Sequence, residues 1–394
     1  MPSRGADASR AIEPGYAAGD ERLRCFDGLR GVLATYVTVS HAVPFAAVPA
    51  WLAGPFLHGG AAVDVFFALS GFVIARAWEA HGADPERFLA ARARRIYPAY
   101  LCVLLFAIPG QLIPLPADAL RWASPAGWEI WSGGWPADGW LVLGLHVVMA
   151  HGVVPDGLLP DAWVGWLGAA WSLSTEWQFY LLVAWVGPRL GRGHPFILRL
   201  TLLLMCMAAA GFAYDRTMPQ GWLFSRAFLP EKAAYFALGV AGAGAFGLRS
   251  GRWWLLLLAL ENCLAFSTQA GMGKALPPLV WVACLAVQRW PSAPLLRVPA
   301  RWLSSAQATG LGAISFSLYL VNEPVQKTLG VVLAWFAGAD AGLFTLFWLP
   351  LAIGLSLAAA SVLHWAVEQP FRRRPSRRRL AVGLHAPHAG VAQW

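Results

Sequence analysis

Long apolar runs separated by short polar segments dominate the sequence. A membrane-spanning helix needs about 20 mostly apolar residues. The runs that approach this length are Cys25–Pro44, Ala61–Ala77, Ile96–Ile113, Ala169–Gly187, Phe196–Tyr214, Phe228–Leu248, Trp253–Ala270, Ala275–Gln288, Gly312–Phe336 and Leu343–Val367. The pattern therefore predicts an all-α, polytopic transmembrane bundle of about ten spanning helices, which fills residues 25–370 as one domain.

An eleventh apolar segment, Trp140–Ala150, is too short to cross and is bounded by Gly, Pro and His, so we expect a re-entrant or interfacial piece. With ten crossings and a cytoplasmic N-terminus, 24 of the 30 basic residues fall on the inner side. Both termini are then cytoplasmic, with residues 1–24 as a polar tail. Residues 371–394 form a basic tail suited to anionic inner-leaflet lipid.

Composition supports a membrane protein. Hydrophobic residues make up 58% of the chain and charged residues 13%, and the mean hydropathy is +0.52. The charged share is about half that of an ordinary globular domain, which excludes a cytosolic enzyme, a disordered chain and a disulfide scaffold. The net charge of +9 comes from clusters between apolar runs, so it indicates topology and not nucleic-acid binding. Five cysteines without a CxxC pair predict neither a disulfide framework nor a metal site.

Two ionisable residues lie in the first run. Arg30 and His41 are 11 residues apart, close to three helical turns, so they share a face about 16 Å apart along the axis. A histidine in a helix is often structural. Because charges within a bilayer are expensive and histidine suits general-base chemistry, we favour a functional role for this pair.

A second basic pair, Arg92 and Arg95, opens the third run in FLAARARRIYPAY. Their i,i+3 spacing places both on one helix face. Spacing alone favours an ordinary positive-inside flank. Paired guanidinium groups also suit bidentate binding of phosphate.

Polar residues also interrupt the second and fourth runs. Asp64 either caps its helix or orients a cation, and Ser70 beside Gly71 fits small-residue packing. Glu176 in WSLSTEWQFYLL is either a carboxylate favoured by a helix N-terminus or a group that orients a histidine or contacts a sugar. For Glu176 we favour function.

The ninth run contains ISFSLYLVNEPVQKTLG. Glu323 and Lys327 are spaced i,i+4, which allows an ion pair, and for Lys327 a structural pair is the favoured interpretation. Pro324 removes a helix hydrogen bond between them. Tyr319, Asn322 and Glu323 are candidates to line a cavity beside this point.

Six segments together resemble the acyltransferase-3 family of integral membrane acyltransferases. They are FDGLRGVLATYVTVSHA, VDVFFALSGFVI, FLAARARRIYPAY, WSLSTEWQFYLL, ISFSLYLVNEP and VEQPFRRR, and they cover residues 25–374 in the family's order. The resemblance implies transfer of an acyl group from cytoplasmic acyl-CoA to an acceptor hydroxyl, and a multi-pass location in a bacterial inner membrane. The expected co-substrate is acetyl-CoA, the expected acceptor is a carbohydrate or glycoside, and no metal is expected.

The resemblance also assigns roles to residues. Arg30 and His41 match the family's Arg-x10-His signature, and Arg92 and Arg95 match its Arg-x-x-Arg signature, which is thought to contact acyl-CoA. This match favours phosphate binding over an ordinary positive-inside flank as the role of Arg92 and Arg95. Glu176 matches the family's acidic position.

The mechanism we expect has His41 as general base, with Glu176 or Asp64 fixing its tautomer. Tyr319 or Asn322 would donate to the developing oxyanion. Trp171 and Glu323 complete the expected substrate-binding residues. A covalent acyl-enzyme is the alternative route.

The chain departs from the family at Asn322, where many members have a histidine; asparagine cannot act as a base. A transporter or flippase would use the same buried charges as a substrate path, although no inverted repeat supports it. A lipid-carrier glycosyltransferase would need acidic metal-binding clusters, and none stands out. The acyl group, the acceptor and the oligomeric state stay open.

Overall fold

The computed structural model describes residues 23–113, 120–124, 135–136, 138–248, 252, 255–260, 263 and 272–372. Every regular element in these ranges is a helix, and one isolated bridge pairs Pro155 with Phe224. The predicted all-α class is therefore confirmed for the described part of the chain. The predicted tails, 1–24 and 371–394, lie outside these ranges apart from two residues each.

Nine helices of 18 or more residues fall within the described ranges. They are α1 (Arg24–Ala42), α3 (Gly59–Ala80), α4 (Pro85–Gln111), α7 (Trp171–Leu190), α8 (Gly193–Thr217), α9 (Leu229–Leu248), α11 (Met272–Arg289), α13 (Ala306–Ala337) and α14 (Ala341–Leu363). Each overlaps one predicted span. The remaining predicted span, Trp253–Ala270, lies largely outside the described residues, as does Glu261 within it.

Short helices connect or extend the long ones. They are α2 (Ala50–Ala53), α6 (Gly139–Val147), α12 (Arg297–Leu303), α15 (Gln369–Arg372), the 3-10 turns η2 (Val43–Phe45), η3 (Gly54–Phe56), η5 (His151–Val153), η6 (Gly168–Ala170) and η7 (Gln220–Trp222), and the π-helix η8 (His364–Glu368). The nine residues of α6 rise about 14 Å, less than half the hydrocarbon thickness of a bilayer. This length agrees with a re-entrant or interfacial piece.

Within the described ranges, three helical segments are long and apolar enough to cross a membrane: Ala50–Ala80, Gly193–Thr217 and Ala341–Arg372. The protein is therefore a membrane protein. Ten spans, and the cytoplasmic side of both termini, stay predictions. Other long helices carry charge at mid-length, as α1 does at Arg30 and α4 at Arg92 and Arg95.

The start of α4 differs from the prediction. The apolar run began at Ile96, but the helix begins at Pro85, where the Asp84 side chain accepts hydrogen bonds from the N–H groups of Glu86 and Arg87. An Asp cap followed by proline at the first position is a strong start signal, and here it lies outside the apolar run. Arg92 therefore lies two turns inside the helix.

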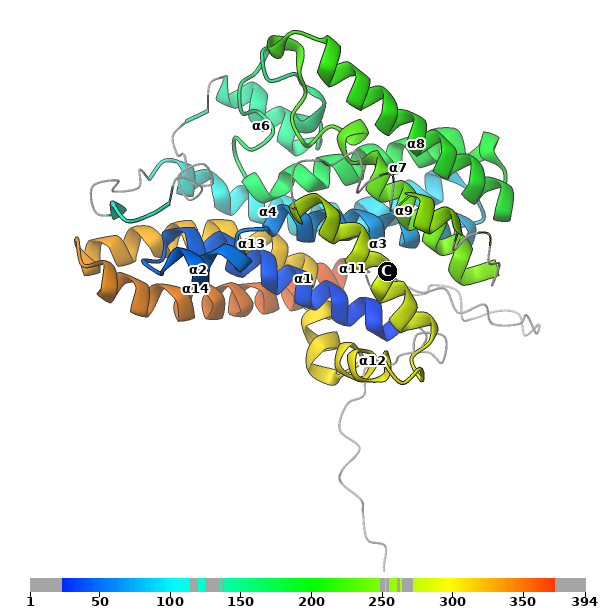
Figure 1. The fold of residues 1–394 in the computed structure, drawn as a ribbon. Helices are drawn as coiled ribbons and strands as arrows, with labels where there is room; N and C mark the ends of the chain where they lie inside the picture. Colours follow the sequence, from blue (N-terminus) through cyan, green and yellow to red (C-terminus); the bar gives the residue numbers. More distant parts are fainter. Residues whose placement is uncertain are drawn as a thin grey trace, which may run out of the picture.

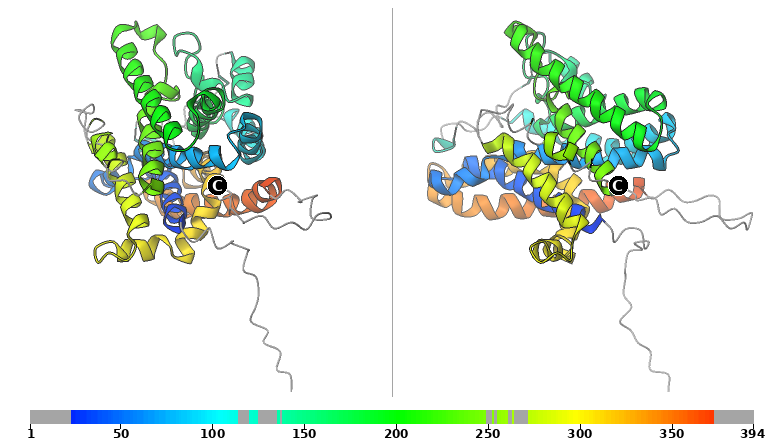
Figure 2. Two further views of the ribbon diagram at one scale, coloured as in Figure 1. Left: turned by 90° about the vertical axis from the view of Figure 1, so that its right-hand side faces the viewer. Right: turned by 45° about the vertical axis from the view of Figure 1, so that its right-hand side comes forward.

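The helices form layers. Figure 1 shows α1, α13 and α14 side by side on one side of the molecule, α7 and α8 on the other, and α3 and α4 between them. The most extensive contacts are those between α1 and α13, α13 and α14, α3 and α9, and α8 and α9. The rotated views in Figure 2 show the same layers. The middle layer therefore faces helices on both sides.

Glycines set the closest helix approach. A Cβ added at Gly239 of α9 would lie 1.9 Å from the carbonyl oxygen of Ala68 on α3, and one at Gly71 would lie 2.3 Å from that of Phe236. Both distances are too short for any side chain. Small residues let the two backbones touch, as is common between membrane helices.

Candidate active site

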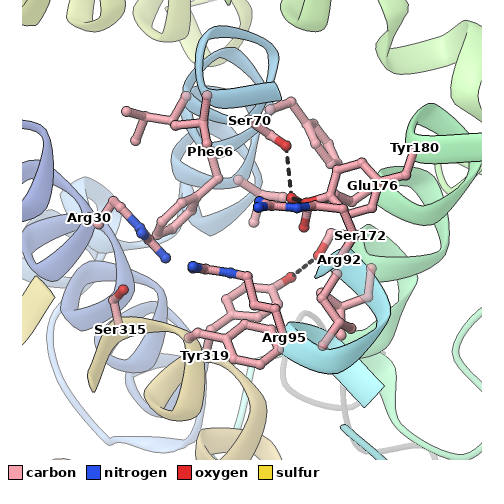
Figure 3. Close-up of a pocket in the computed structure, with 17 residues that line it drawn as sticks. Arg30, Phe66, Ser70, Arg92, Arg95, Ser172, Glu176, Tyr180, Ser315 and Tyr319 are labelled. Carbon is pink, nitrogen blue, oxygen red and sulfur yellow. Dashed lines mark hydrogen bonds between the residues drawn. The ribbon is translucent and has the colours of Figure 1, made fainter. Parts of the chain in front are cut away.

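A pocket opens where α1, α3, α4, α7 and α13 meet, and it encloses about 820 Å³ of space including its open mouth. Its walls are mainly apolar, but polar side chains converge on it from all five helices (Figure 3). These are Arg30, Ser70, Arg92, Arg95, Ser172, Glu176, Tyr180, Ser315 and Tyr319. The structure thus brings together five residues that the sequence singled out separately, Arg30, Arg92, Arg95, Glu176 and Tyr319.

Three arginines dominate the electrostatics of the pocket. Arg92 is 6% exposed and Arg30 and Arg95 are half-buried, and Figure 3 shows the guanidinium groups of Arg30 and Arg95 reaching into the cavity. The Nη1 atom of Arg95 is buried and has no hydrogen-bond partner within the described residues. Glu176 is the one acidic side chain among the described lining residues. This surplus of positive charge in a partly apolar pocket suits an anion with several oxygens, such as a phosphate.

The carboxylate of Glu176 is fixed by two hydroxyl donors. Ser70 Oγ donates to Oε1 at 2.7 Å, and the buried Tyr180 hydroxyl donates to the same oxygen. Ser70 is therefore part of the site, and the packing role expected for it belongs to Gly71. The i,i+4 spacing of Glu176 and Tyr180 is the sequence signal for this contact.

His41 lies at the end of α1, outside the set of residues that line the pocket. Its Nδ1 lies 2.6 Å from Oδ1 of Asn322. The expectation that Glu176 or Asp64 fixes the His41 tautomer is therefore wrong. Glu176 is held by Ser70 and Tyr180, and Asn322, from α13, is the partner of the histidine.

The orientation of the Asn322 amide determines which ring nitrogen of His41 carries the proton. The Asn322 side chain is fully buried, and its Nδ2 donates to the carbonyl oxygens of Leu318 at 3.1 Å and Tyr319 at 2.6 Å. Both amide protons are thereby used, so Oδ1 faces the ring as an acceptor. The proton of neutral His41 is then on Nδ1, and Nε2 carries the lone pair.

This arrangement overturns one expected role for Asn322. With both protons bound to backbone carbonyls, its amide has no donor left for an oxyanion. Tyr319 remains available because its hydroxyl lines the pocket and shares a hydrogen bond of 2.7 Å with Ser172. Tyr319 and Asn322 are three residues apart on α13, about 4.5 Å along the axis, so the pocket wall and the His41 partner are neighbours.

The Asp64 carboxylate forms an ion pair with a lysine. Its Oδ1 accepts from Lys232 Nζ on α9 at 2.8 Å, and both side chains are largely buried. The alternative of a helix cap does not hold, because α3 begins five residues earlier at Gly59. The Lys232 ammonium also lies 5.7 Å from the ring centroid of Trp171.

Glu323 and Lys327 do not pair. The Glu323 carboxylate accepts the N–H groups of Gly168 at 3.0 Å and Ala169 at 2.5 Å, and Lys327 Nζ donates to Gln111 Oε1 at 2.5 Å. The two N–H groups open the turn before α7, and free amides at a helix start attract a carboxylate more specifically than a nearby lysine does. Glu323 therefore positions the entry of α7 and does not line the pocket.

The pocket and its arginines belong to a helical membrane protein, and comparison with known proteins identifies the class as acyltransferase. Residues 23–365 match the family described as acyltransferase domain, Acyl_transf_3, so the chain belongs to that family. Family membership decides in favour of an enzyme over the transporter that the sequence left open.

Two relatives illustrate the family. The chain is 30% identical over 353 residues to acyltransferase MdmB of Streptomyces mycarofaciens, covering 82% of this chain and 83% of that protein. It is 40% identical over 83 residues to an O-acetyl transferase of Shigella phage Sf6, covering 21% of this chain and 25% of that one. No solved structure matches the chain.

Proposed function

We propose that this acyltransferase moves an acyl group from cytoplasmic acyl-CoA to a hydroxyl of a carbohydrate-type acceptor, with acetyl-CoA as the first donor to test. The observation that carries the proposal is the convergence of Arg30, Arg92 and Arg95 on one pocket. CoA carries its phosphates at one end and its thioester at the other. An enzyme that uses it needs a cationic pocket and, some distance away, a base.

The donor end of the proposal is the arginine pocket. Arg92 and Arg95 bind the CoA phosphates, and Arg30 marks the face along which the pantetheine arm extends. Arg30 and His41 are about 16 Å apart along α1, so one helix spans from the phosphate region to the base. We place this enzyme in a bacterial inner membrane, with the arginine end of the pocket toward the cytoplasm, as the density of arginines there favours.

The chemical step uses His41 Nε2 as general base. Nε2 removes the acceptor hydroxyl proton while the oxygen attacks the thioester carbonyl. The tetrahedral intermediate then collapses, the C–S bond breaks, and the CoA thiolate takes the proton back from His41. The products are an acyl ester and free CoA, and His41 is again neutral. The Tyr319 hydroxyl is the group we assign to the developing oxyanion.

Glu176 has a supporting role in this proposal. It lies in the pocket with Arg92 and Arg95 and is oriented by Ser70 and Tyr180, so its carboxylate offsets part of the arginine charge from a fixed position. It is not placed to contact His41, whose Nδ1 is already bound by Asn322.

Thiol release by the purified protein tests the proposal. Acetyl-CoA is supplied with a panel of sugar acceptors, and free CoA is followed alongside acylated product. Acceptor-dependent release with matching product supports the proposal. Arg94→Gln is the matched control for the pocket arginines, because Arg94 lies between them in sequence but does not line the pocket. Product that carries an acyl group taken from a donor other than CoA would contradict it.

A further inference from the structure

The pocket has a second end, away from the arginines. Its lining follows α3 from Val73 to Val63, which are ten residues or about 15 Å apart. Val73 is near the end of α3 that leads into α4 and its arginines. Val63 is near the opposite end, next to Asp64, and the lining residue Phe66, three residues further along α3, packs edge-on against Tyr319, which is hydrogen-bonded to Ser172.

A cation–aromatic cluster of Asp64, Trp163, Trp171, Arg226 and Lys232 lies against this second end. Trp171 precedes the lining residue Ser172 and packs edge-on against the lining residue Phe67, with ring centroids 5.8 Å apart. The cluster is thus in contact with the pocket wall.

Arg226 is the exposed member of the cluster. Its guanidinium carbon lies 4.8 Å from the ring centroid of Trp163 and 5.6 Å from that of Trp171, and the two indoles meet at 78°. No carboxylate lies within 4.0 Å of it among the described residues. Stacking on two rings holds the guanidinium in place while leaving its N–H groups accessible.

The backbone that carries Arg226 is equally fixed. The carbonyl oxygen of the next residue, Ala227, accepts from Thr175 Oγ1 and Gln178 Nε2, both at 2.9 Å. Gln178 Oε1 in turn accepts the N–H of Leu229 at 2.9 Å. The backbone at Arg226 is therefore held against α7, so a ligand would not have to order it.

The other charges of the cluster cancel. Lys232 is bound to Asp64 at 2.8 Å, and Tyr235 stands beside this pair with its ring centroid 5.6 Å from Nζ. The surplus positive charge of the cluster is that of Arg226. A fixed guanidinium among aromatic rings offers bidentate hydrogen bonds to an oxyanion and apolar surface to a sugar ring.

We propose that the cation–aromatic cluster binds a carboxylate or phosphate on the acceptor, so that the enzyme selects acidic carbohydrates. This inference rests on the proposed function, which requires an acceptor opposite the arginine pocket. Arg226 is the residue that determines the selection, and Trp163 and Trp171 position it.

Equilibrium binding tests the proposal. The full-length protein in zwitterionic nanodiscs is titrated with an oligosaccharide that contains hexuronic acid and with its carboxyl-reduced, neutral counterpart. A second pair compares a hexose phosphate with the free hexose. We expect at least one acidic member to bind about tenfold or more tightly than its neutral counterpart. Arg226→Gln should remove that difference.

The matched control is Arg216→Gln. Arg216 is also exposed and lies 4.0 Å from the ring centroid of Phe212, but it stands at the end of α8, away from the pocket lining. It should leave the acidic preference unchanged. Equal binding of both members of each pair, including no binding of any, overturns the proposal, and so does a preference that survives Arg226→Gln.

A lipid headgroup is the other source of such an anion. Native mass spectrometry in nanodiscs that contain phosphatidylglycerol shows whether Arg226→Gln releases bound anionic lipid. Lipid loss without sugar selectivity overturns the acceptor assignment. Selective binding of the acidic sugar without thiol release contradicts the proposed function but supports this site. Thiol release without a preference for acidic sugars supports the proposed function but contradicts this site.

Discussion

Asn322 Oδ1 lies 2.6 Å from His41 Nδ1 and fixes the imidazole proton on that nitrogen. A neutral amide here orients the ring without adding a charge, because its own protons are bound to the carbonyl oxygens of Leu318 and Tyr319. The base nitrogen of the proposed mechanism, Nε2, is thereby left with its lone pair. The residue that departs from the family pattern thus has a defined role in orienting the histidine.

Substitution of Asn322 separates orientation from charge. Asn322→Leu should lower kcat about tenfold or more with little change in the KM for acetyl-CoA, since the donor pocket is untouched. Asn322→Asp keeps an acceptor but adds a negative charge, which favours protonated imidazole. The acid limb of its pH–rate profile should move to higher pH. An unchanged profile in Asn322→Asp would show that the amide does not act through His41.

The pocket arginines should control donor affinity. Charge-assisted hydrogen bonds contribute about 1.5–3 kcal/mol each, so Arg92→Gln and Arg95→Gln should each weaken CoA binding about tenfold or more. Calorimetric titration of CoA measures this, with Arg94→Gln as the control that keeps wild-type affinity. Equal weakening by Arg94→Gln would indicate a general electrostatic effect and not a phosphate site.

The α3–α9 contact should be sensitive to a single methyl group. Gly239→Ala places a Cβ 1.9 Å from the Ala68 carbonyl oxygen, so we expect a loss of about 1–3 kcal/mol, seen as a lower thermal midpoint in detergent. Gly354→Ala is the control, because a Cβ at this exposed position of α14 meets nothing within 4 Å. Alanine there should be neutral or stabilising. Equal thermal midpoints for the two variants would show that α3 and α9 can move apart without loss of stability, which contradicts this prediction.

Two stacked histidines predict a pH-dependent segment between α6 and α7. The rings of His146 and His151 are buried with centroids 3.9 Å apart, and burial lowers the pKa of His151, in η5 outside the long helices, from 6.5 to about 4. The unfolded segment takes up a proton below about pH 6.5 that the folded one excludes. Local stability is therefore full above that pH and falls toward pH 4, by up to about 3 kcal/mol.

Hydrogen exchange of residues 142–153, corrected for the intrinsic rate, checks this effect. Protection should be lower at pH 5 than at pH 7.5, while α13 keeps its protection at both. In His151→Gln, the pH dependence should shrink. The same protection at both pH values in the wild type would contradict the assignment.

The sequence predicted what depends on local pattern. Apolar runs located the long helices, and helical spacing placed Arg92 and Arg95 on one helix face, from which both line the pocket. The partners of polar side chains were mostly missed, because they come from distant helices. Asp64 pairs with Lys232, which is 168 residues away, and His41 with Asn322, which is 281 away. Spacing within one helix suggested the wrong partner for Glu323, whose ligands are backbone amides of a turn.

Thiol release by His41→Ala under saturating acetyl-CoA tests the central claim most directly. The variant should lose about 10²–10⁴-fold in acceptor-dependent rate and keep wild-type CoA affinity, because His41 lies outside the arginine pocket. His58→Ala, at an exposed histidine before α3, should match the wild type. Undiminished release by His41→Ala would contradict the account and assign the proton transfer to another group.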